Sequence, residues 1–358
     1  MLRTRLVNPA ADDELVEMLA SGGRIGLDTE FMRESTFYAQ LCLVQIATPQ
    51  SIYCADPLIE GELGPFWKAL CQCEWVLHSG RQDLEVVYQT AGRMPRHVFD
   101  TQVAAGLLGM QPQLGYAQLV KELFDVELAK GHTRADWSQR PLGEAMLDYA
   151  SEDVAYLLEA ATILIDRLEA LGRLDWALED SAALLDPALY EFHPADAIER
   201  LKAARNLRGR ARRAAVRLAA WREKRAQQAD RPRQWILKDS VLMELAGSDP
   251  STEADIGRIP GMPAATARRS GRELLAELQA ARDEKDEYVP PGRPDERQKA
   301  ALKRMQTEVV AISSELGIAA EVLAPRKELS AAIQGDRTGR VFRGWRRELI
   351  GDRLLELI

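Results

Sequence analysis

Two acidic residues on one short apolar segment are the most chemically informative feature of this 358-residue sequence. Asp28 and Glu30 lie two positions apart between Arg24 and Phe31, a segment whose apolar composition predicts a β-strand. Because side chains alternate across a strand, both carboxylates project from the same face. Repulsion between them raises the pKa of one carboxyl unless cations lie between them, so the pair is a natural ligand set for divalent metal ions.

Three further residues fit the same site. Asp83 follows the strand-like segment 74–78 and begins an apolar stretch, which places it near a strand-to-helix turn. Tyr149 and Asp153 are four positions apart in a segment, 142–158, with helical apolar spacing, so they share one helix face. Each feature alone is common on a solvated surface. Their order and contexts, however, would bring them to one sheet edge.

These motifs resemble those of ribonuclease D, in the tyrosine-containing branch of the DEDD exonuclease superfamily. Asp28 and Glu30 match the first motif, Asp83 the second, and Tyr149 with Asp153 the third. The flanking segments LCLVQIAT and HTRADWSQRPL also fit, and the resemblance covers essentially the whole chain. It implies an α/β ribonuclease H-like exonuclease domain with a mixed sheet, followed by two small all-helical bundle domains.

The resemblance also implies two divalent cations, Mg²⁺ or Mn²⁺, and no small organic cofactor. Asp28 would bridge the ions, Glu30 and Asp153 would hold the ion on the nucleophile side, and Asp83 would support the other. Ions about 3.5–4 Å apart can activate the attacking water and stabilise the leaving 3′ oxygen. Tyr149 would orient that water, because a phenol with a pKa near ~10 is a poor general base at neutral pH.

Charge is distributed unevenly along the chain, whose net charge is −8. Residues 1–199 carry 32 acidic and 14 basic side chains, whereas residues 200–225 carry 11 basic and one acidic. An acidic catalytic domain that handles a polyanion needs metal and a separate basic surface. The basic segment predicts such a surface, with Arg208, Arg212 and Arg213 as candidate RNA contacts. Its apolar positions also fit an ordinary core-facing helix stripe.

The chain divides into four parts by pattern. Residues 1–195 alternate helical stretches with predicted strands, which indicates the 3′-5′ exonuclease domain. Residues 205–282 resemble the helicase and RNase D C-terminal (HRDC) domain, and 298–358 resemble a second, more divergent copy. Residues 283–297 are charged and proline-rich, which predicts a linker. The strands are predicted at 25–31, 41–47, 52–55, 75–78 and 98–101.

The cysteines and one histidine allow simpler interpretations. Cys42, Cys54, Cys71 and Cys73 lack the paired C-x₂-C pattern of a zinc site, so buried reduced thiols are predicted. His78 lies close to the second motif, where it either touches RNA or has a structural role.

The sequence predicts a 3′-to-5′ exoribonuclease that releases nucleoside 5′-monophosphates, and the resemblance points to RNA with a single-stranded 3′ end, such as tRNA precursors and other small structured RNAs. A DNA exonuclease is the first alternative, because the motifs do not report the 2′-hydroxyl. The second is a non-catalytic RNA-binding adaptor, against which the presence of all five site residues argues. Without an apolar run of membrane-spanning length or a secretion signal, a cytoplasmic location away from membranes is expected.

Overall fold

The computed structural model describes residues 3–129, 135–285 and 292–358, which fall into two compact units. The sheet unit contains the described residues up to 32, 41–190 and 292–358. The helical unit contains 33–40 and the described residues from 191 to 285. The short segment 33–40 therefore belongs to a different unit from the strands that precede and follow it.

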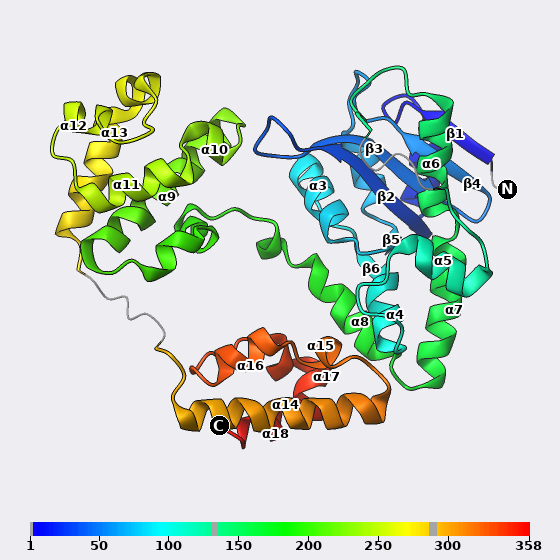
Figure 1. Ribbon diagram of the computed structural model, residues 1–358. Coiled ribbons are helices and arrows are strands. Elements are labelled where there is room, and N and C mark those ends of the chain that lie inside the picture. Colours follow the sequence, from blue (N-terminus) through cyan, green and yellow to red (C-terminus); the bar gives the residue numbers. More distant parts are fainter. Residues whose placement is uncertain (1–2, 130–134, 286–291) are drawn as a thin grey trace. The chain divides into compact units, whose positions relative to one another are not determined.

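The strands of the sheet unit are β1 (Arg3–Val7), β2 (Arg24–Met32), β3 (Gln40–Ala47), β4 (Ser51–Ala55), β5 (Glu74–Leu77) and β6 (His97–Asp100). In the described part of the chain they form one six-stranded mixed sheet in the order β1-β4-β3-β2-β5-β6 (Figure 1). β1 pairs parallel with β4, β4 antiparallel with β3, and β5 parallel with both β2 and β6. The five predicted strands are confirmed to within one or two residues.

β1 is a strand that the sequence does not predict. Its segment RTRLV contains two arginines and little apolar pattern. The strand lies at the edge of the sheet order, where charged side chains are tolerated and protect against edge pairing. Arg5 is accordingly half-exposed and lies 3.6 Å from the carboxylate of Asp12. A strand at the edge of a sheet therefore need not alternate polar and apolar residues, which is the pattern on which strand prediction depends.

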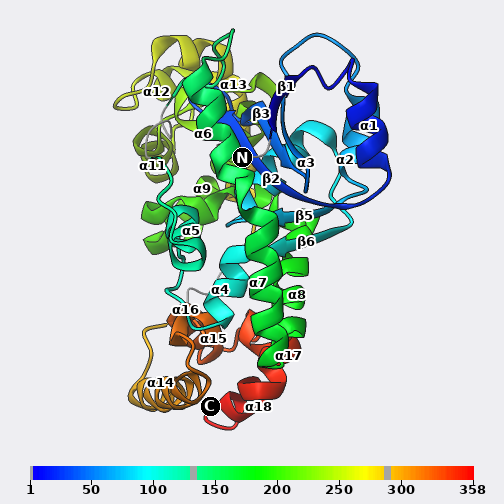
Figure 2. The ribbon, with the colours of Figure 1, turned by 90° about the vertical axis from the view of Figure 1, so that its right-hand side faces the viewer.

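Helices pack on both faces of this sheet. Figure 2 shows α6 and α7 on one side and α1 and α2 on the other. Gly26 of β2 allows a close approach of α7, since a Cβ there would lie 3.0 Å from the Cβ of Leu157. The bounds are α1 (Asp13–Ala20), α2 (Gly64–Leu70), α3 (Arg81–Ala91), α4 (Thr101–Leu107), α5 (Tyr116–Phe124), α6 (Glu144–Ala155), α7 (Leu157–Ala170), α8 (Leu174–Ala182), η1 (Ala183–Leu185) and η2 (Pro187–Leu189).

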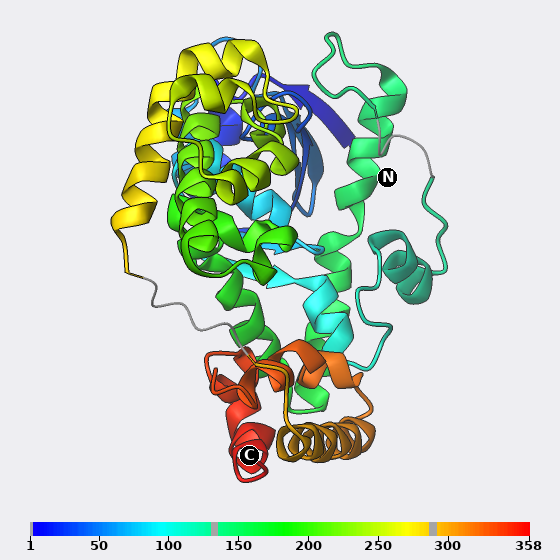
Figure 3. The same cartoon turned by 60° about the vertical axis from the view of Figure 1, so that its left-hand side comes forward.

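The C-terminal residues 292–358 share a hydrophobic core with α4 and α7 of the same unit. Trp345 stacks on Trp176 with ring centroids 4.3 Å apart, and the buried Arg346 donates to Asp180 at 2.7 Å. The segment expected as a second helical module is therefore joined to the exonuclease helices by a common core. It comprises α14 (Glu296–Leu316, seen nearly end-on in Figure 3), α15 (Ala320–Leu323), α16 (Arg326–Ala332), η5 (Arg340–Phe342), α17 (Gly344–Arg346), the π-helix η6 (Arg347–Gly351) and α18 (Asp352–Leu355).

The helical unit has a core of its own, built from α9, α11 and α13. Its elements are η3 (Pro194–Arg200), η4 (Lys202–Asn206), α9 (Gly209–Ala229), α10 (Arg233–Ile236), α11 (Asp239–Ser248), α12 (Glu253–Gly257) and α13 (Ala264–Asp283). As predicted, no strand occurs among the described residues from 195 onward. None of the described helices in either unit combines the length and apolar character needed to cross a membrane. Part of the expected linker, 286–291, lies outside the described residues.

The four cysteines are all in the described part of the sheet unit. Each is a reduced thiol with a buried side chain, as predicted. Burial raises the pKa of Cys54 to about 12 and those of the other three to about 11. The thiols therefore stay protonated at neutral pH, which makes them unreactive packing groups.

Candidate active site

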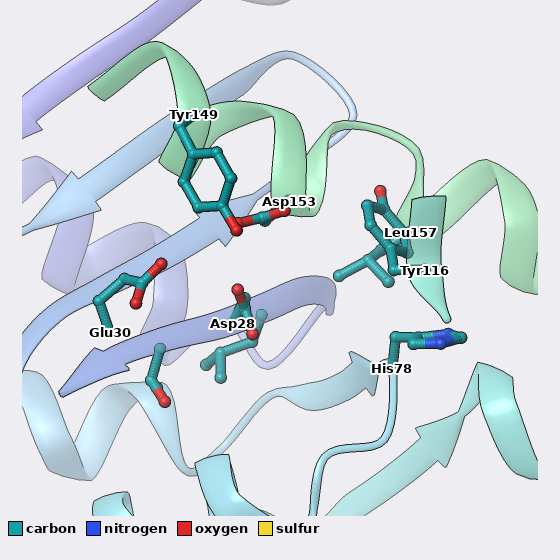
Figure 4. A pocket seen from close by; sticks show the side chains of 9 residues that line it. Asp28, Glu30, His78, Tyr116, Tyr149, Asp153 and Leu157 are labelled. Atoms are coloured by element: carbon teal, nitrogen blue, oxygen red, sulfur yellow. The ribbon is translucent and has the colours of Figure 1, made fainter. Parts of the chain in front are cut away.

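Three carboxylates meet above the centre of strand β2. Asp28 and Glu30 project from one face of the strand, as predicted from their spacing, and Asp153 approaches from α6 (Figure 4). One oxygen from each side chain lies within 4.8 Å of the others. The structure thus brings together residues that are separated by more than 120 positions in the sequence.

Asp83 lies in the first turn of α3, directly after the turn that follows β5. Its carboxylate is 7% exposed and accepts a hydrogen bond of 2.5 Å from the hydroxyl of Thr29. The carboxylate of Asp100 holds the preceding turn by accepting the Gly80 N–H at 2.8 Å. Gly80 is required there, because a Cβ would lie 2.4 Å from the side chain of Leu77. The predicted strand-to-helix turn is therefore present and rigidly held.

Helix α6 carries Tyr149 and Asp153 on one face, one turn apart. The predicted single helix over 142–158 is wrong in one detail, because the chain breaks between α6 and α7 at Tyr156. The N–H of Tyr156 donates to the hydroxyl of Tyr116, at 3.0 Å. This tertiary hydrogen bond fixes the end of α6, and with it the position of Asp153 in its last turn.

The segment that leads into α6 is anchored to the sheet by one arginine. Arg140 donates to both carboxylate oxygens of Asp56, at 2.5 and 2.7 Å, and to the carbonyl of Cys42 at 2.8 Å. Asp56 is 1% exposed, so the paired hydrogen bonds form in a largely desolvated setting where they are strong. Residues 132–134 of the motif HTRADWSQRPL lie outside the described residues.

The electrostatics of the site oppose full ionisation of its carboxyl groups. Burial, and then the charges of Asp83, Asp153 and Glu30, raise the pKa of Asp28 well above its ordinary value. Burial is also the main cause that raises the pKa of Glu30 to about 8, of Asp153 to about 7 and of Asp83 to about 6. Crowded, buried carboxylates of this kind are stabilised either by protons or by cations.

The donor set fits divalent metal ions. All the charged groups that line the cavity are carboxylates, and within the described residues no lysine or arginine lines it. Its volume is about 250 Å³. Hard carboxylate oxygens without a cationic side chain between them match the ligand preference of Mg²⁺ and Mn²⁺.

Known proteins resemble this chain over nearly its whole length. A family model of the 3′-5′ exonuclease domain matches residues 8–169, and one of the HRDC domain matches residues 211–278. The chain is 36% identical over 350 residues to ribonuclease D of Xanthomonas oryzae pv. oryzae, which covers 96% of each chain. The chain belongs to the ribonuclease D family.

Two further ribonuclease D proteins support this family membership. The chain is 34% identical to that of Sphingobium indicum over 354 residues, or 95% of this chain and 90% of the relative. Its structure is similar to the crystal structure of Escherichia coli RNase D, described as an exoribonuclease involved in structured RNA processing. The TM-score is 0.88 at 28% identity, covering 99% of this chain and 98% of that one. The protein is thus a 3′-to-5′ exoribonuclease whose family depends on divalent metal.

Tyr149 lines the cavity from the same face of α6 as Asp153. Its hydroxyl donates a hydrogen bond to Asp153, and burial raises the pKa of the phenol further above its ordinary value. The hydroxyl therefore keeps its proton at any physiological pH. Its oxygen remains able to accept a hydrogen bond from water, but it does not act as a base.

His78 lines the cavity, but both of its ring nitrogens are engaged. Nε2 donates to the carbonyl of Leu114 at 2.8 Å, and Nδ1 lies 2.9 Å from the hydroxyl of Thr101. Burial lowers the pKa of the ring, which favours the neutral form. The imidazole therefore offers a fixed ring surface and no titrating group, so of the two interpretations for His78 the structural role is the better supported.

Sequence reasoning did not name four residues that line the cavity: Leu27, Thr29, Tyr116 and Leu157. Thr29 lies between the two acidic residues of β2, so strand alternation turns it to the opposite face, where it bonds Asp83. That alternation was a usable signal. Tyr116 and Leu157 reach the cavity from α5 and α7, and nothing in their local sequence indicates it.

The three candidate RNA-binding arginines lie in the helical unit and differ in exposure. Arg208 is exposed at the N-terminus of α9. Arg212 is only 9% exposed, and Arg213 donates to the carbonyl of Ala281 at 2.8 Å. Burial of Arg212 disfavours a phosphate contact there, so Arg208 is the remaining exposed candidate of the three.

The raised carboxyl pKa values predict a metal affinity that increases with pH. Cations compete with protons for Glu30 and Asp153, whose pKa values are about 8 and about 7. Below pH 7 both groups are largely protonated, so the apparent affinity for Mn²⁺ should fall by up to about tenfold per pH unit for each proton displaced. Titration of the metal-free protein with Mn²⁺ at pH 6, 7 and 8.5, followed by electron paramagnetic resonance, measures this. An affinity independent of pH would contradict the assignment of these ligands.

Proposed function

We propose that this protein trims the single-stranded 3′ ends of small structured RNAs, tRNA precursors in particular, by two-metal hydrolysis with Mg²⁺ or Mn²⁺. The products would be nucleoside 5′-monophosphates. The observation that carries the proposal is the meeting of Asp28, Glu30 and Asp153 within 4.8 Å in a small cavity free of lining lysine and arginine among the described residues. We assign the cations to these three carboxylates and Asp83.

The residues divide the work as follows. Asp28 and Glu30 lie side by side on β2 and supply negatively charged metal ligands where the scissile phosphate enters. Asp153 adds a third carboxylate from α6. Cations held by these carboxylates would activate the attacking water and offset the charge that develops on the leaving 3′ oxygen. The hydroxyl oxygen of Tyr149 accepts a hydrogen bond from the attacking water, while its O–H donates a hydrogen bond to Asp153. The cavity, of about 250 Å³, suits one terminal nucleoside and excludes a duplex.

The proposed domain roles extend this account. The HRDC match over 211–278 supports a helical domain at 205–282 that contacts RNA, with Arg208 as one exposed basic group. We keep residues 298–358 as a second HRDC-like part and 283–297 as the linker between the two. The buried, protonated thiols of the four cysteines support a reducing, cytoplasmic location.

The experiment uses a tRNA precursor with a short single-stranded 3′ trailer, labelled at its 5′ end. The expected result is a ladder that shortens one nucleotide at a time and slows at the acceptor stem, because the cavity excludes paired nucleotides. Thin-layer chromatography of a 3′-end-labelled substrate should identify nucleoside 5′-monophosphates. A single internal cut at the mature end would contradict the proposal.

A matched DNA strand tests the first alternative. The residues that line the cavity do not by themselves distinguish the 2′-hydroxyl, which separates RNA from DNA. Family membership favours RNA, so the RNA strand should be degraded faster than DNA of the same sequence. Equal or faster degradation of DNA would support a DNA exonuclease, and binding without degradation of either would support the adaptor alternative.

A further inference from the structure

A second cavity, of about 530 Å³, lies entirely within the helical unit. One wall is the segment 33–40, which leaves β2 and packs with the residues of this unit, and the others come from η3, α9 and α10. The residues that matter for its chemistry are four arginines and two phenylalanines: Arg33, Arg200, Arg222, Arg233, Phe37 and Phe192. Neither family match, over residues 8–169 or 211–278, assigns a ligand to this cavity.

The two phenylalanines form a fixed aromatic platform. Phe37 and Phe192 meet edge to face with ring centroids 5.1 Å apart. The guanidinium of Arg233 lies 4.4 Å from the centroid of Phe37 and 5.3 Å from that of Phe192. Glu223, 1% exposed, locks Arg233 by accepting two hydrogen bonds of 2.6 Å. The platform is therefore positioned before any ligand arrives.

The side chain of Asp230 ties the segment 33–40 to the end of α9. Asp230, just after the end of α9, accepts the backbone N–H groups of Phe37 and Tyr38 at 2.9 and 3.0 Å. Two charge-assisted hydrogen bonds hold the tip of the segment against the helical unit. The wall that contains Phe37 is therefore held in place by these hydrogen bonds.

Arg222 supplies a donor that lacks an acceptor. Its side chain lines the cavity although the residue is 3% exposed, and Nη1 donates to the carbonyl of Leu237 and to Asp239. Its Nε has no hydrogen-bond partner among the described residues. A buried N–H without an acceptor is costly and uncommon in native proteins.

The charges that line the cavity favour a polyanion. Four guanidinium groups face two carboxylates, those of Glu34 and Asp239. Arg200 is 42% exposed and only loosely paired, 3.5 Å from Glu223. Its guanidinium lies 5.5 Å from the centroid of the Phe192 ring, so the arginines and the aromatic rings alternate along this wall. Aromatic faces interleaved with arginines are the usual platform for unpaired nucleotides.

We propose that this cavity binds a nucleotide of single-stranded RNA, with its phosphate at the arginines and its base against Phe192. The proposal rests on the proposed function, since it makes the cavity a holding site for the strand being shortened. Only two residues of sequence separate Glu30, at the catalytic carboxylates, from Arg33, the first lining residue. A volume of about 530 Å³ suits one or two nucleotides.

The test compares two double variants of the full-length protein. Arg33→Ala with Arg200→Ala removes two charges from the cavity, and Arg268→Ala with Arg269→Ala removes two exposed charges from α13, outside it. Binding of a 5′-fluorescein-labelled oligoadenylate of about 12 nucleotides is measured by anisotropy in EDTA, which prevents hydrolysis. The cavity variant should bind about tenfold more weakly, with a salt slope smaller by about 1.4. The control should change less than about twofold.

Equal losses in the two variants, or none in either, would overturn the proposal. If the cavity variant fails to fold by circular dichroism, cross-linking of the wild type with 4-thiouridine-containing RNA replaces it. Adducts are expected on the peptide that contains Phe192, and adducts confined elsewhere would refute the site. If a phosphoserine peptide, and not unlabelled RNA, blocked the formation of these adducts, the cavity would bind a protein partner. That result would also refute the proposal. Failure of the proposed function would appear separately, as no degradation of the same oligonucleotide in Mg²⁺.

Discussion

Replacing Asp28 by Asn is expected to abolish hydrolysis and to stabilise the metal-free protein. Asp28 belongs to the carboxylate cluster, and its pKa is raised by burial and then by the charges of Asp83, Asp153 and Glu30. Loss of a ligand worth several kcal/mol in the transition state lowers kcat by about 10⁴-fold or more. Single-turnover degradation of a 5′-labelled single-stranded RNA in Mg²⁺ measures this loss.

The same substitution is expected to lower activity but to raise the stability of the metal-free protein, and the reason is electrostatic. The folded-state pKa of Asp28 lies well above its unfolded value, so folding without metal requires proton uptake that becomes harder as pH rises. Asparagine removes this requirement, and each 1 kcal/mol gained raises the Tm of a domain of this size by about 2–4 °C. Thermal melts in EDTA should show the largest increase at alkaline pH.

Asp148→Asn is the matched control for the Asp28 variant. Asp148 is exposed on α6, one residue before Tyr149, and does not line the cavity. It undergoes the same chemical change, and neither activity nor metal-free stability should respond appreciably. A folded Asp28→Asn protein with unchanged turnover would refute the metal-site assignment.

Tyr149→Phe is expected to slow hydrolysis on the order of 10²-fold while leaving metal binding nearly intact. The phenylalanine keeps the ring but loses the hydroxyl that is bonded to Asp153 and placed to orient water. That hydrogen bond also lowers the pKa of Asp153, so its loss should weaken Mn²⁺ binding only slightly, and more at pH 7 than at pH 8.5. Single-turnover rates and Mn²⁺ titrations on the same sample separate the two effects.

Tyr53→Phe provides a comparison in which a hydroxyl is removed away from the site. Tyr53 lies in β4 and packs under the guanidinium of Arg5, outside the residues that line the cavity. The rate of RNA hydrolysis by the Tyr53→Phe protein should match that of the wild type. If Tyr149→Phe lost metal affinity in proportion to its rate, Tyr149 would act by assembling the carboxylates, and the water-orienting role would be incorrect.

The parts of the site that sequence reasoning found are those with a local period. Alternation in β2 places Asp28 and Glu30 on one face, and the helical repeat of α6 places Tyr149 and Asp153 on one face. Asp83 was located by its position between a strand and a helix. In each case a few neighbouring residues contain the whole signal, so no knowledge of tertiary packing is needed.

The features that the sequence did not predict depend on contacts between distant segments. The break at Tyr156 requires a hydrogen bond from its N–H to the hydroxyl of Tyr116, 40 residues away. The segment 33–40 joins the helical unit through Asp230, about 190 positions later, and Trp345 joins the exonuclease helices by stacking on Trp176. Such pairings have no local period, because either partner would look ordinary without the other.

The most direct test of the central claim is a time course on a 5′-labelled RNA hairpin with a single-stranded 3′ tail. Wild-type protein and Asp28→Asn are compared in Mg²⁺ and in EDTA. We expect a ladder that shortens from the 3′ end only with the wild type in Mg²⁺, and that stops near the base of the hairpin. Shortening that persists in EDTA or in the Asp28→Asn protein would contradict hydrolysis by metal ions held at these carboxylates.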